Sequence, residues 1–255
     1  MWKIAISFLF LTQLFSISFA GMPSDLVLYM SFDKNTITGN EVKDISNYGN
    51  KGLIKGSPKV VAGYRGEALE FNGASDTVEI VTSDSLAKTA KQITLEAWVF
   101  TVKDGTQDVV SKWDNVMNGI IHFEFQAGGI IRYCMRDKND ATIVNLLTPG
   151  GKLPMKEWAH IAETYDGKTA RIYVNGTEVL SGAGAGDMRD NKDIKYWIGS
   201  MYATDRWFGG MIDEVRIWSK ALTQEEIKKS IDGTLIGAAV DRNNKLTTTW
   251  GMIQA

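Results

Sequence analysis

The chain has 255 residues, with 28 basic and 30 acidic side chains and a formal charge of -2 at neutral pH. A single cysteine excludes an internal disulfide, a thiolate zinc site and a CxxC redox pair, and two histidines leave little for a His-rich metal centre. The basic residues form no stripe along the chain, so nucleic acid is not an expected partner.

The first twenty residues have the pattern of a secretory signal peptide. Lys3 precedes the apolar run Ile4–Leu14, and Ser18 and Ala20 place small residues at the third and first positions before a cleavage point. The run is shorter than the ~20 apolar residues of a membrane helix, so a retained anchor is the weaker alternative. We therefore expect residues 1–20 to be removed, which would leave a secreted or periplasmic protein with no membrane span.

Beyond residue 25 the chain consists of short β-branched and aromatic runs separated by turn signals, a pattern typical of a sandwich or barrel. Asp166-Gly167 and Asn175-Gly176 are dipeptides typical of tight hairpins. The expected strands are 26–32, 68–71, 77–81, 93–100, 120–126, 130–136, 160–165, 170–174, 177–180, 196–199 and 212–218.

One helix is expected near the C-terminus. Thr223 and Glu226 have the spacing of a capping box, and Gly233 provides a stop signal. No Pro-rich linker and no repeat divides the chain, so we expect one all-β domain at 21–234, a two-sheet antiparallel sandwich with one short C-terminal helix. A tail at 235–255 follows, and the sequence leaves open whether it is solvated or docked.

A series of motifs in a fixed order resembles bacterial laminin-G-like jelly-roll domains. The motifs are LYMSFD at 28–33, DISNYGN at 44–50, GEALEFNG at 66–73, ITLEAWV at 93–99, EWAH at 157–160, YDG at 165–167, IYVNG at 172–176, FGGMIDEVRIW at 208–218 and ALT at 221–223. The resemblance spans about residues 25–232 and is to the concanavalin-A-like lectin and glucanase superfamily. It implies a two-sheet jelly roll with one concave face. It implies no single activity, because this fold carries lectins, adhesion modules, lyases and hydrolases.

The resemblance also implies a structural calcium ion. Strict alternation along the last strand places Asp213 on the apolar face with Val215, where a carboxylate needs a partner. In related domains the equivalent aspartate often helps to bind calcium with oxygens near the first strand. Carried over to this chain, Asp33 and the Asn72-Gly73 turn would join Asp213, with oxygen ligands that suit calcium. A turn cap or an arginine partner for Asp213 is the alternative.

The segment 120–136 offers an enzymatic hypothesis. If Gly128-Gly129 is a two-residue hairpin turn, His122, Glu124 and Tyr133 share one face and Cys134 lies on the other. An imidazole, a carboxylate and a phenol on the concave face could perform acid–base chemistry on a polysaccharide. A polar patch that satisfies its own hydrogen bonds is the favoured alternative. The Glu-x-Asp-x-x-Glu signature of laminarinases in this superfamily is absent, which disfavours hydrolysis.

Aromatic residues in two expected loops are the candidates for binding a sugar. Each loop combines flat rings with polar neighbours, as a sugar with apolar and hydroxyl faces requires: Trp113, Asp114 and Asn115 in one loop, and Tyr202, Asp205, Arg206 and Trp207 in the other. Packing of both tryptophans over the sandwich rim is the alternative.

Together these features predict a secreted, non-catalytic module that binds a carbohydrate or a cell-surface protein. Two alternatives stay open. One is a polysaccharide-degrading enzyme, a lyase or a glycoside hydrolase, that uses His122, Glu124 and Tyr133. The other is a structural adhesion module without a sugar site.

Overall fold

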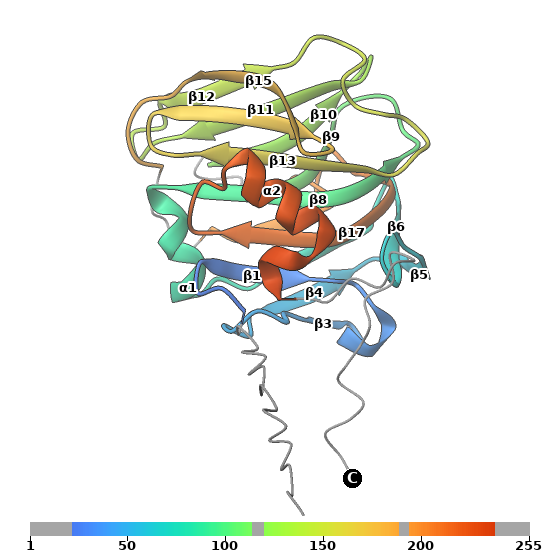
Figure 1. The fold of residues 1–255 in the computed structure, drawn as a ribbon. Helices are drawn as coiled ribbons and strands as arrows, with labels where there is room; N and C mark the ends of the chain where they lie inside the picture. Colours follow the sequence, from blue (N-terminus) through green and yellow to red (C-terminus); the bar gives the residue numbers. More distant parts are fainter. Residues whose placement is uncertain (1–21, 114–119, 189–193, 238–255) are drawn as a thin grey trace, which may run out of the picture.

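A computed structural model describes residues 22–113, 120–188 and 194–237, and in these ranges two antiparallel sheets lie face to face (Figure 1). Eight of the described strands form one sheet, in the order β15 (Thr177–Ala183), β14 (Thr169–Val174), β13 (Ala159–Tyr165), β8 (Ile93–Thr101), β17 (Gly209–Trp218), β6 (Glu67–Asn72) and β5 (Lys59–Ala62), with β1 (Leu26–Met30) also paired with β17. The other nine described strands form the second sheet, in the order β12 (Thr142–Leu147), β11 (Ile130–Arg136), β10 (Ile121–Gln126), β9 (Gln107–Lys112), β16 (Tyr196–Ile198), β7 (Thr77–Ile80), β4 (Lys51–Lys55), β3 (Glu41–Lys43) and β2 (Ile37–Thr38). The predicted two-sheet, all-β jelly-roll sandwich is confirmed.

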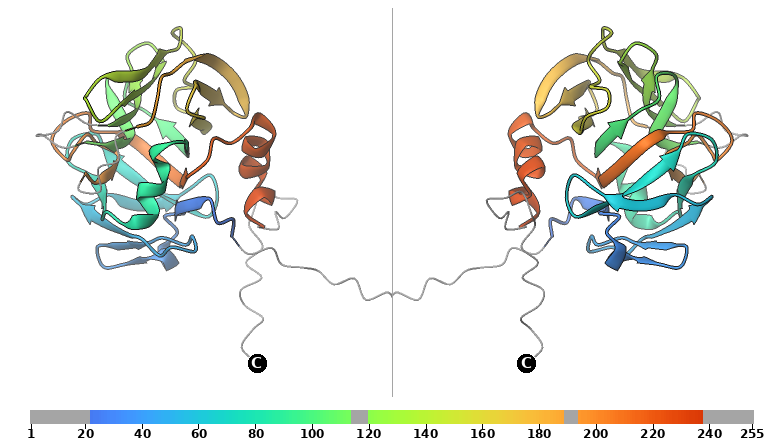
Figure 2. Two further views of the ribbon diagram at one scale, coloured as in Figure 1. Left: turned by 90° about the vertical axis from the view of Figure 1, so that its left-hand side faces the viewer. Right: turned by 90° about the vertical axis from the view of Figure 1, so that its right-hand side faces the viewer.

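The predicted C-terminal helix is α2 (Gln224–Asp232), which lies across the outer face of the eight-stranded sheet (Figures 1 and 2). The Thr223 hydroxyl accepts the Glu226 N–H and the Glu226 carboxylate accepts the Thr223 N–H, so the capping box is confirmed. Gly233 ends the helix in the left-handed region, with a φ of 85°. The short helical turns are η1 (Lys34–Thr36), α1 (Asp84–Ala87), η2 (Lys88–Ala90) and η3 (Thr234–Ile236).

The predicted signal peptide at 1–20 and residues 238–255 of the predicted tail lie outside the described residues. Among the helices in the described ranges, none is long and apolar enough to cross a membrane.

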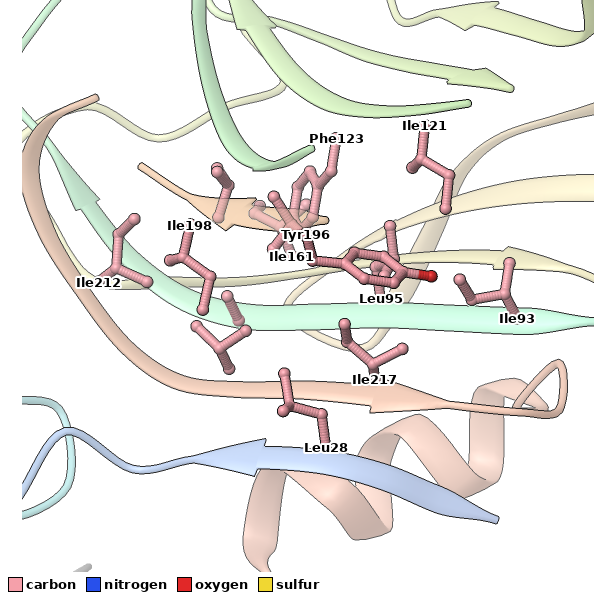
Figure 3. Packing of buried hydrophobic residues seen from close by; sticks show 14 of the residues in the cluster. Leu28, Ile93, Leu95, Ile121, Phe123, Ile161, Tyr196, Ile198, Ile212 and Ile217 are labelled. Carbon is pink, nitrogen blue, oxygen red and sulfur yellow. The ribbon is translucent and has the colours of Figure 1, made fainter. Parts of the chain in front are cut away.

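The core fills the space between the two sheets. Leu95, Ile161 and Ile217 from the eight-stranded sheet and Phe123 and Ile198 from the nine-stranded sheet gather there (Figure 3), and all five are fully buried. Alternate residues of each strand face inward, as the period of two predicts. Burial of each such side chain stabilises the fold by about 1.5–3 kcal/mol relative to exposure. A second apolar cluster, which includes Tyr173, Trp218 and Ile227, lies under α2 on the outer face of the eight-stranded sheet.

Glu163 of β13 is an exception, because it points into this core with its register partners Leu95 and Ile172. Its side chain is fully buried, and within the described residues neither carboxylate oxygen has a hydrogen-bond partner. Burial raises the pKa of Glu163 well above its ordinary value, and the nearby Asp108 and Cys134 raise it further. The folded protein therefore favours the protonated form of this acid.

Substituting Glu163→Met should raise the free energy of unfolding at neutral pH by about 1–3 kcal/mol, the cost of a buried polar group without a partner. Because the folded-state pKa of Glu163 is raised, the folded protein keeps a proton that the unfolded chain releases above about pH 4.3. Wild-type stability therefore falls as the pH rises above that value, and the advantage of the variant grows. Urea unfolding at about pH 4 and pH 7 measures this difference. A variant less stable than wild type at neutral pH would contradict the explanation.

Candidate functional site

Three buried polar residues meet on the outer face of the nine-stranded sheet, at the centre of β9 and β10. Glu124 lies opposite Asp108, and a bulge between Phe123 and Glu124 leaves His122 opposite Ser111. Nδ1 of His122 lies 2.9 Å from Oδ2 of Asp108. Asp108 and Glu124 are 0% exposed and His122 is 4% exposed, so the sandwich buries two carboxylates on a face that is not its core. Such burial is costly unless each carboxylate has a cationic partner.

Two arginines supply that partner. Nη1 of Arg132, directly opposite Glu124 on β11, lies 3.3 Å from Oε2 of Glu124. Arg206 forms an ion pair with the same oxygen, and its Nη1 lies 3.9 Å from Oδ1 of Asp108. Nε2 of Gln126 donates to Oε1 of Glu124 at 2.6 Å. The two guanidinium groups thus balance the two carboxylates.

The arginines form the accessible part of this cluster. The side chains of Arg132 and Arg206 are 22% and 24% exposed, whereas Glu124 lies beneath them. A guanidinium that a buried carboxylate holds in place offers its remaining N–H donors in a fixed geometry. The arrangement can therefore donate hydrogen bonds to an incoming polar ligand with little loss of side-chain entropy.

The same cluster has the donor set of a metal site. Asp108, His122 and Glu124 each offer one ligand atom, and these atoms lie within 4.8 Å of one another. The Arg206 guanidinium already provides the positive charge at this point, since it pairs with Glu124 and approaches Asp108. We therefore read the cluster as a support for Arg132 and Arg206 rather than as a metal centre.

The predicted aromatic residues flank this cluster. The half-buried Trp113 follows β9, and its ring centroid lies 4.8 Å from that of His122. On the other side, the Tyr202 ring meets the Trp197 ring edge-on at 5.5 Å, and Trp197 lies opposite Ser111 on β9. Aromatic rings and arginine donors on one face of a sheet are the groups that contact the apolar and hydroxyl faces of a sugar.

The loop that carries Arg206 is fixed to β9 by backbone contacts. The Asp108 N–H donates to the Arg206 carbonyl at 2.9 Å, and the Ser111 hydroxyl donates to the Ser200 carbonyl at 2.8 Å. Arg206 adopts a φ of 52°, a left-handed conformation that these contacts hold. The loop therefore positions the Arg206 side chain over the cluster rather than leaving it in solvent.

Within the described residues, the other residues predicted to bind a sugar form no hydrogen bond or ion pair with the cluster of Asp108, His122 and Glu124. Asp205 is exposed and Trp207 is half-buried, and the Trp207 carbonyl accepts the Lys103 ammonium at 2.7 Å. Trp207 lies where the chain crosses from β16 to β17 in the other sheet. Asp114 and Asn115 lie outside the described residues. The structure thus brings Trp113, Tyr202 and Arg206 to one face and leaves Asp205 and Trp207 at its edge.

The predicted catalytic set is wrong in one member. Gln126 pairs with Ile130, so the β10–β11 hairpin has a three-residue loop, and Tyr133 lies opposite Phe123 in the core. Cys134 lies opposite His122 on the outer face, where it is still buried. Because side chains alternate with a period of two, a shift of one residue moves every side chain to the other face.

The longer loop has a visible physical cause. Gly128 and Gly129 both have a positive φ, of 76° and 70°, which a two-glycine turn would also allow. The Gly128 N–H, however, donates to Oδ1 of Asp104 at 2.8 Å, and the Gly128 carbonyl accepts the Gly151 N–H at 2.8 Å. These contacts from two neighbouring loops hold Ala127, Gly128 and Gly129 together as the loop.

Of the four residues predicted to bind calcium, Asp33 and Asp213 contact the same turn. The Arg65 N–H donates to Oδ2 of Asp213, and the Glu67 N–H donates to Oδ1 of Asp33, both at 2.9 Å. The two carboxylates therefore hold the same turn between β5 and β6. Burial, together with the charges of Glu214 and Asp33, raises the pKa of Asp213 well above its ordinary value. Oδ1 of Asp213 is buried and has no hydrogen-bond partner among the described residues.

Asp213 does not share a face with Val215, contrary to the prediction from strict alternation. A bulge between Asp213 and Arg216 leaves Asp213 opposite Trp98 on the outer face of the sheet, while Val215 remains in the core. Glu214 in the bulge has a φ of 55°. An extra residue in one strand changes the alternation on either side of it.

Asn72 and Gly73 are not part of this carboxylate pair. Asn72 lies opposite Gly209 on β17, four residues before Asp213, which is about 13 Å along a strand. The Asn72 side-chain oxygen accepts the N–H groups of Ala74 and Ser75 in its own turn. The prediction that the Asn72-Gly73 turn joins Asp213 is therefore wrong, and the turn before Glu67 takes that place.

Comparison with known proteins places the fold. A family model described as the concanavalin A-like lectin/glucanases superfamily, of the laminin G type, matches residues 39–228. The chain belongs to this superfamily. The resemblance found in the motifs is thereby confirmed, and the matched residues include every described strand except β1 and β2, and most of α2. No curated protein matches the chain.

Solved structures share the laminin-G-like fold at low sequence identity. The binding domain of Paraclostridial Mosquitocidal Protein 1 is 16% identical, with a TM-score of 0.65 over 82% of this chain and 52% of that chain. The receptor binding domain of botulinum neurotoxin C/D mosaic serotype is 14% identical, with a TM-score of 0.65 over 85% and 53%. Domain 4 of AbnA, a GH43 extracellular arabinanase from Geobacillus stearothermophilus, in complex with arabinotriose, is 20% identical, with a TM-score of 0.57 over 80% and 97%. The chain spans about half the length of the first two structures, and these likenesses show the fold alone.

Proposed function

We propose that this laminin-G-like domain is a secreted, non-catalytic module that binds a carbohydrate on the outer face of its nine-stranded sheet. The observation that carries the proposal is the pair of partly exposed arginines, Arg132 and Arg206, fixed over buried carboxylates, with the half-buried Trp113 ring against His122 of the same cluster. The arabinotriose bound to the arabinanase domain and the receptor-binding role of the neurotoxin domain support a binding role for this fold. Secretion remains a prediction from residues 1–20.

Binding fits this geometry better than catalysis. A general acid or base must come within hydrogen-bond reach of the substrate. Glu124 lies beneath the two arginines, and His122 is 4% exposed with the Trp113 ring against it, so neither group is open to a substrate. Tyr133, the third member of the catalytic hypothesis, lies in the core.

Isothermal titration with neutral trisaccharides, including arabinotriose, tests this proposal. Trp113→Ala removes a stacking surface, and Arg132→Lys keeps the charge beside Glu124 but removes the forked donors. Each should weaken binding about tenfold or more, the effect of about 1.4 kcal/mol. Arg171→Lys is the matched control, because Arg171 is a partly exposed arginine paired with Asp166 on the other sheet.

The result separates the three functional classes. Unchanged affinity in both variants would refute the proposed site. New reducing ends released from a polysaccharide by the wild-type domain would instead support the enzyme. Absence of any glycan ligand would favour an adhesion module without a sugar site.

We also propose that Asp33 and Asp213 hold a structural calcium ion. The support is the unpartnered, buried Oδ1 of Asp213 and the second carboxylate at the same turn. Carboxylate and backbone carbonyl oxygens suit calcium, which tolerates flexible geometry. A bound cation would offset the repulsion between the two carboxylates, which contributes to the raised pKa of Asp213.

A further inference from the structure

An open groove crosses the outer face of the eight-stranded sheet, on the opposite side of the sandwich from Arg132 and Arg206. Its volume is about 470 Å³, within the range of pockets that hold small ligands. The lining residues come from β5, β6, β8 and β17 and the adjoining turns: Ser57, Lys59, Glu70, Phe71, Asn72, Asp76, Phe100, Val102, Gly210 and Met211. The groove shares no residue with the site on the nine-stranded sheet.

Four side chains aligned by the strand register form the floor of this groove. Lys59 lies opposite Glu70, Glu70 opposite Met211, and Met211 opposite Phe100, so four side chains form a row across four strands. The Phe100 ring lies 5.8 Å from the ring of Trp158, which continues the row toward β13. The row is apolar at one end and charged at the other.

The row is accessible to a ligand. Phe100, Met211 and Trp158 are half-buried, Lys59 and Glu70 are exposed, and Val102 at the groove's edge is 52% exposed. Trp158 belongs to the EWAH motif at 157–160, and the structure leaves part of its ring at the surface. An exposed apolar surface beside charged groups is typical of a binding site.

We propose that this groove binds a neutral oligosaccharide as a second site of the domain. A sugar ring has an apolar face that stacks on Phe100 and Trp158, while its hydroxyls accept from the Lys59 ammonium and donate to the Glu70 carboxylate. Asp76 is only 3% exposed and its two oxygens accept the N–H groups of Ser57 and Asn72, so this carboxylate is not presented to a ligand. The exposed charges of the row therefore balance, which favours an uncharged ligand.

The direction of the groove argues against a peptide. A peptide that adds to a sheet pairs its backbone along an edge strand. This row instead runs across β5, β6, β17 and β8, and the last three of these strands are paired on both sides. Side chains rather than backbone groups must therefore recognise the ligand, as they do for a sugar.

The groove is proposed to bind the same class of ligand as the site on the nine-stranded sheet, but it uses different residues. Either proposal can therefore fail while the other holds. Isothermal titration of the wild-type domain with arabinotriose, xylotriose and cellotriose should give two sites per chain for at least one of these sugars. Glu70→Gln and Phe100→Ala should each weaken one site about tenfold or more and leave the other unchanged. Trp113→Ala should weaken only the site on the nine-stranded sheet and leave the groove unchanged. Glu41→Gln is the control, because Glu41 is an exposed glutamate on the other sheet.

Each outcome decides the question. Glu70→Gln changes only a surface charge and is not expected to disturb folding, which circular dichroism checks. Unchanged binding in both groove variants would overturn the second site and leave the first intact. Loss of all binding in the groove variants, with Trp113→Ala unaffected, would support the groove and refute the first site. Failure of all three trisaccharides to bind would overturn the groove proposal.

Discussion

Replacing Arg216 with alanine should lower the free energy of unfolding by about 3–5 kcal/mol, the loss expected when one partner of a buried ion pair is removed. Arg216 is fully buried, forms an ion pair with Glu214 and lies 3.7 Å from Oε1 of Glu96. Its Nη1 also donates to the Ser230 hydroxyl of α2 at 3.1 Å. The substitution would leave two buried carboxylates with less compensation and would loosen α2 from the sheet.

Glu96 shows why this network needs its cations. Burial would raise the pKa of Glu96, but His160, Arg216 and Ser230 outweigh burial and lower it from 4.5 to about 2. A lowered folded-state pKa contributes stability above pH 4.5 that is lost as the pH falls toward 2. The charged form of Glu96 is therefore part of the folded state across the neutral range.

Urea unfolding followed by tryptophan fluorescence measures the Arg216→Ala effect. The control is Arg171→Ala, because Nη1 of Arg171 lies 3.1 Å from Asp166 in a partly exposed pair whose loss costs about 0–1 kcal/mol. Equal losses in the two variants would show that the buried network does not anchor α2.

Calcium at a hundred times its dissociation constant should raise the free energy of unfolding by about 2.7 kcal/mol. Asp213→Ala and Asp33→Ala should each abolish this increase, because each removes a carboxylate from the proposed site. Asn72→Ala should leave the calcium response intact, because the structure places Asn72 in a separate turn. Thermal unfolding with calcium and with chelator measures all four proteins. A wild-type domain that does not respond to calcium would refute the proposal.

The sequence predicts the sandwich well, because period-two alternation is a local property of each strand. The capping box at Thr223 and the hairpin at Asn175-Gly176 are local as well, and both are confirmed. Six of the described strands are missed: β2, β3, β4, β5, β9 and β12. In β9, Val109 and Val110 are the only adjacent apolar pair, and the bulge beside them disrupts the alternation. Local pattern therefore recovers the architecture but not each strand.

The candidate site is harder to predict, because its geometry depends on non-local contacts. Tyr133 is assigned to the wrong face because loop contacts from Asp104 and Gly151, distant in sequence, set the hairpin register. Asp108 and Arg132 are missed because they meet Glu124 only through pairing of β9, β10 and β11. If a three-residue hairpin loop is assumed in place of a two-residue turn, the sequence alone places Arg132 opposite Glu124.

The most direct test of the carbohydrate site follows the tryptophan indole N–H signals of the ¹⁵N-labelled domain during titration with a binding trisaccharide. The structure predicts that the indole signal of Trp113 shifts as the ligand saturates, while those of the buried Trp98 and Trp218 do not. Substitution of Trp113→Phe assigns the signal. A saturating trisaccharide that leaves the Trp113 signal unmoved would contradict binding at this face of the nine-stranded sheet.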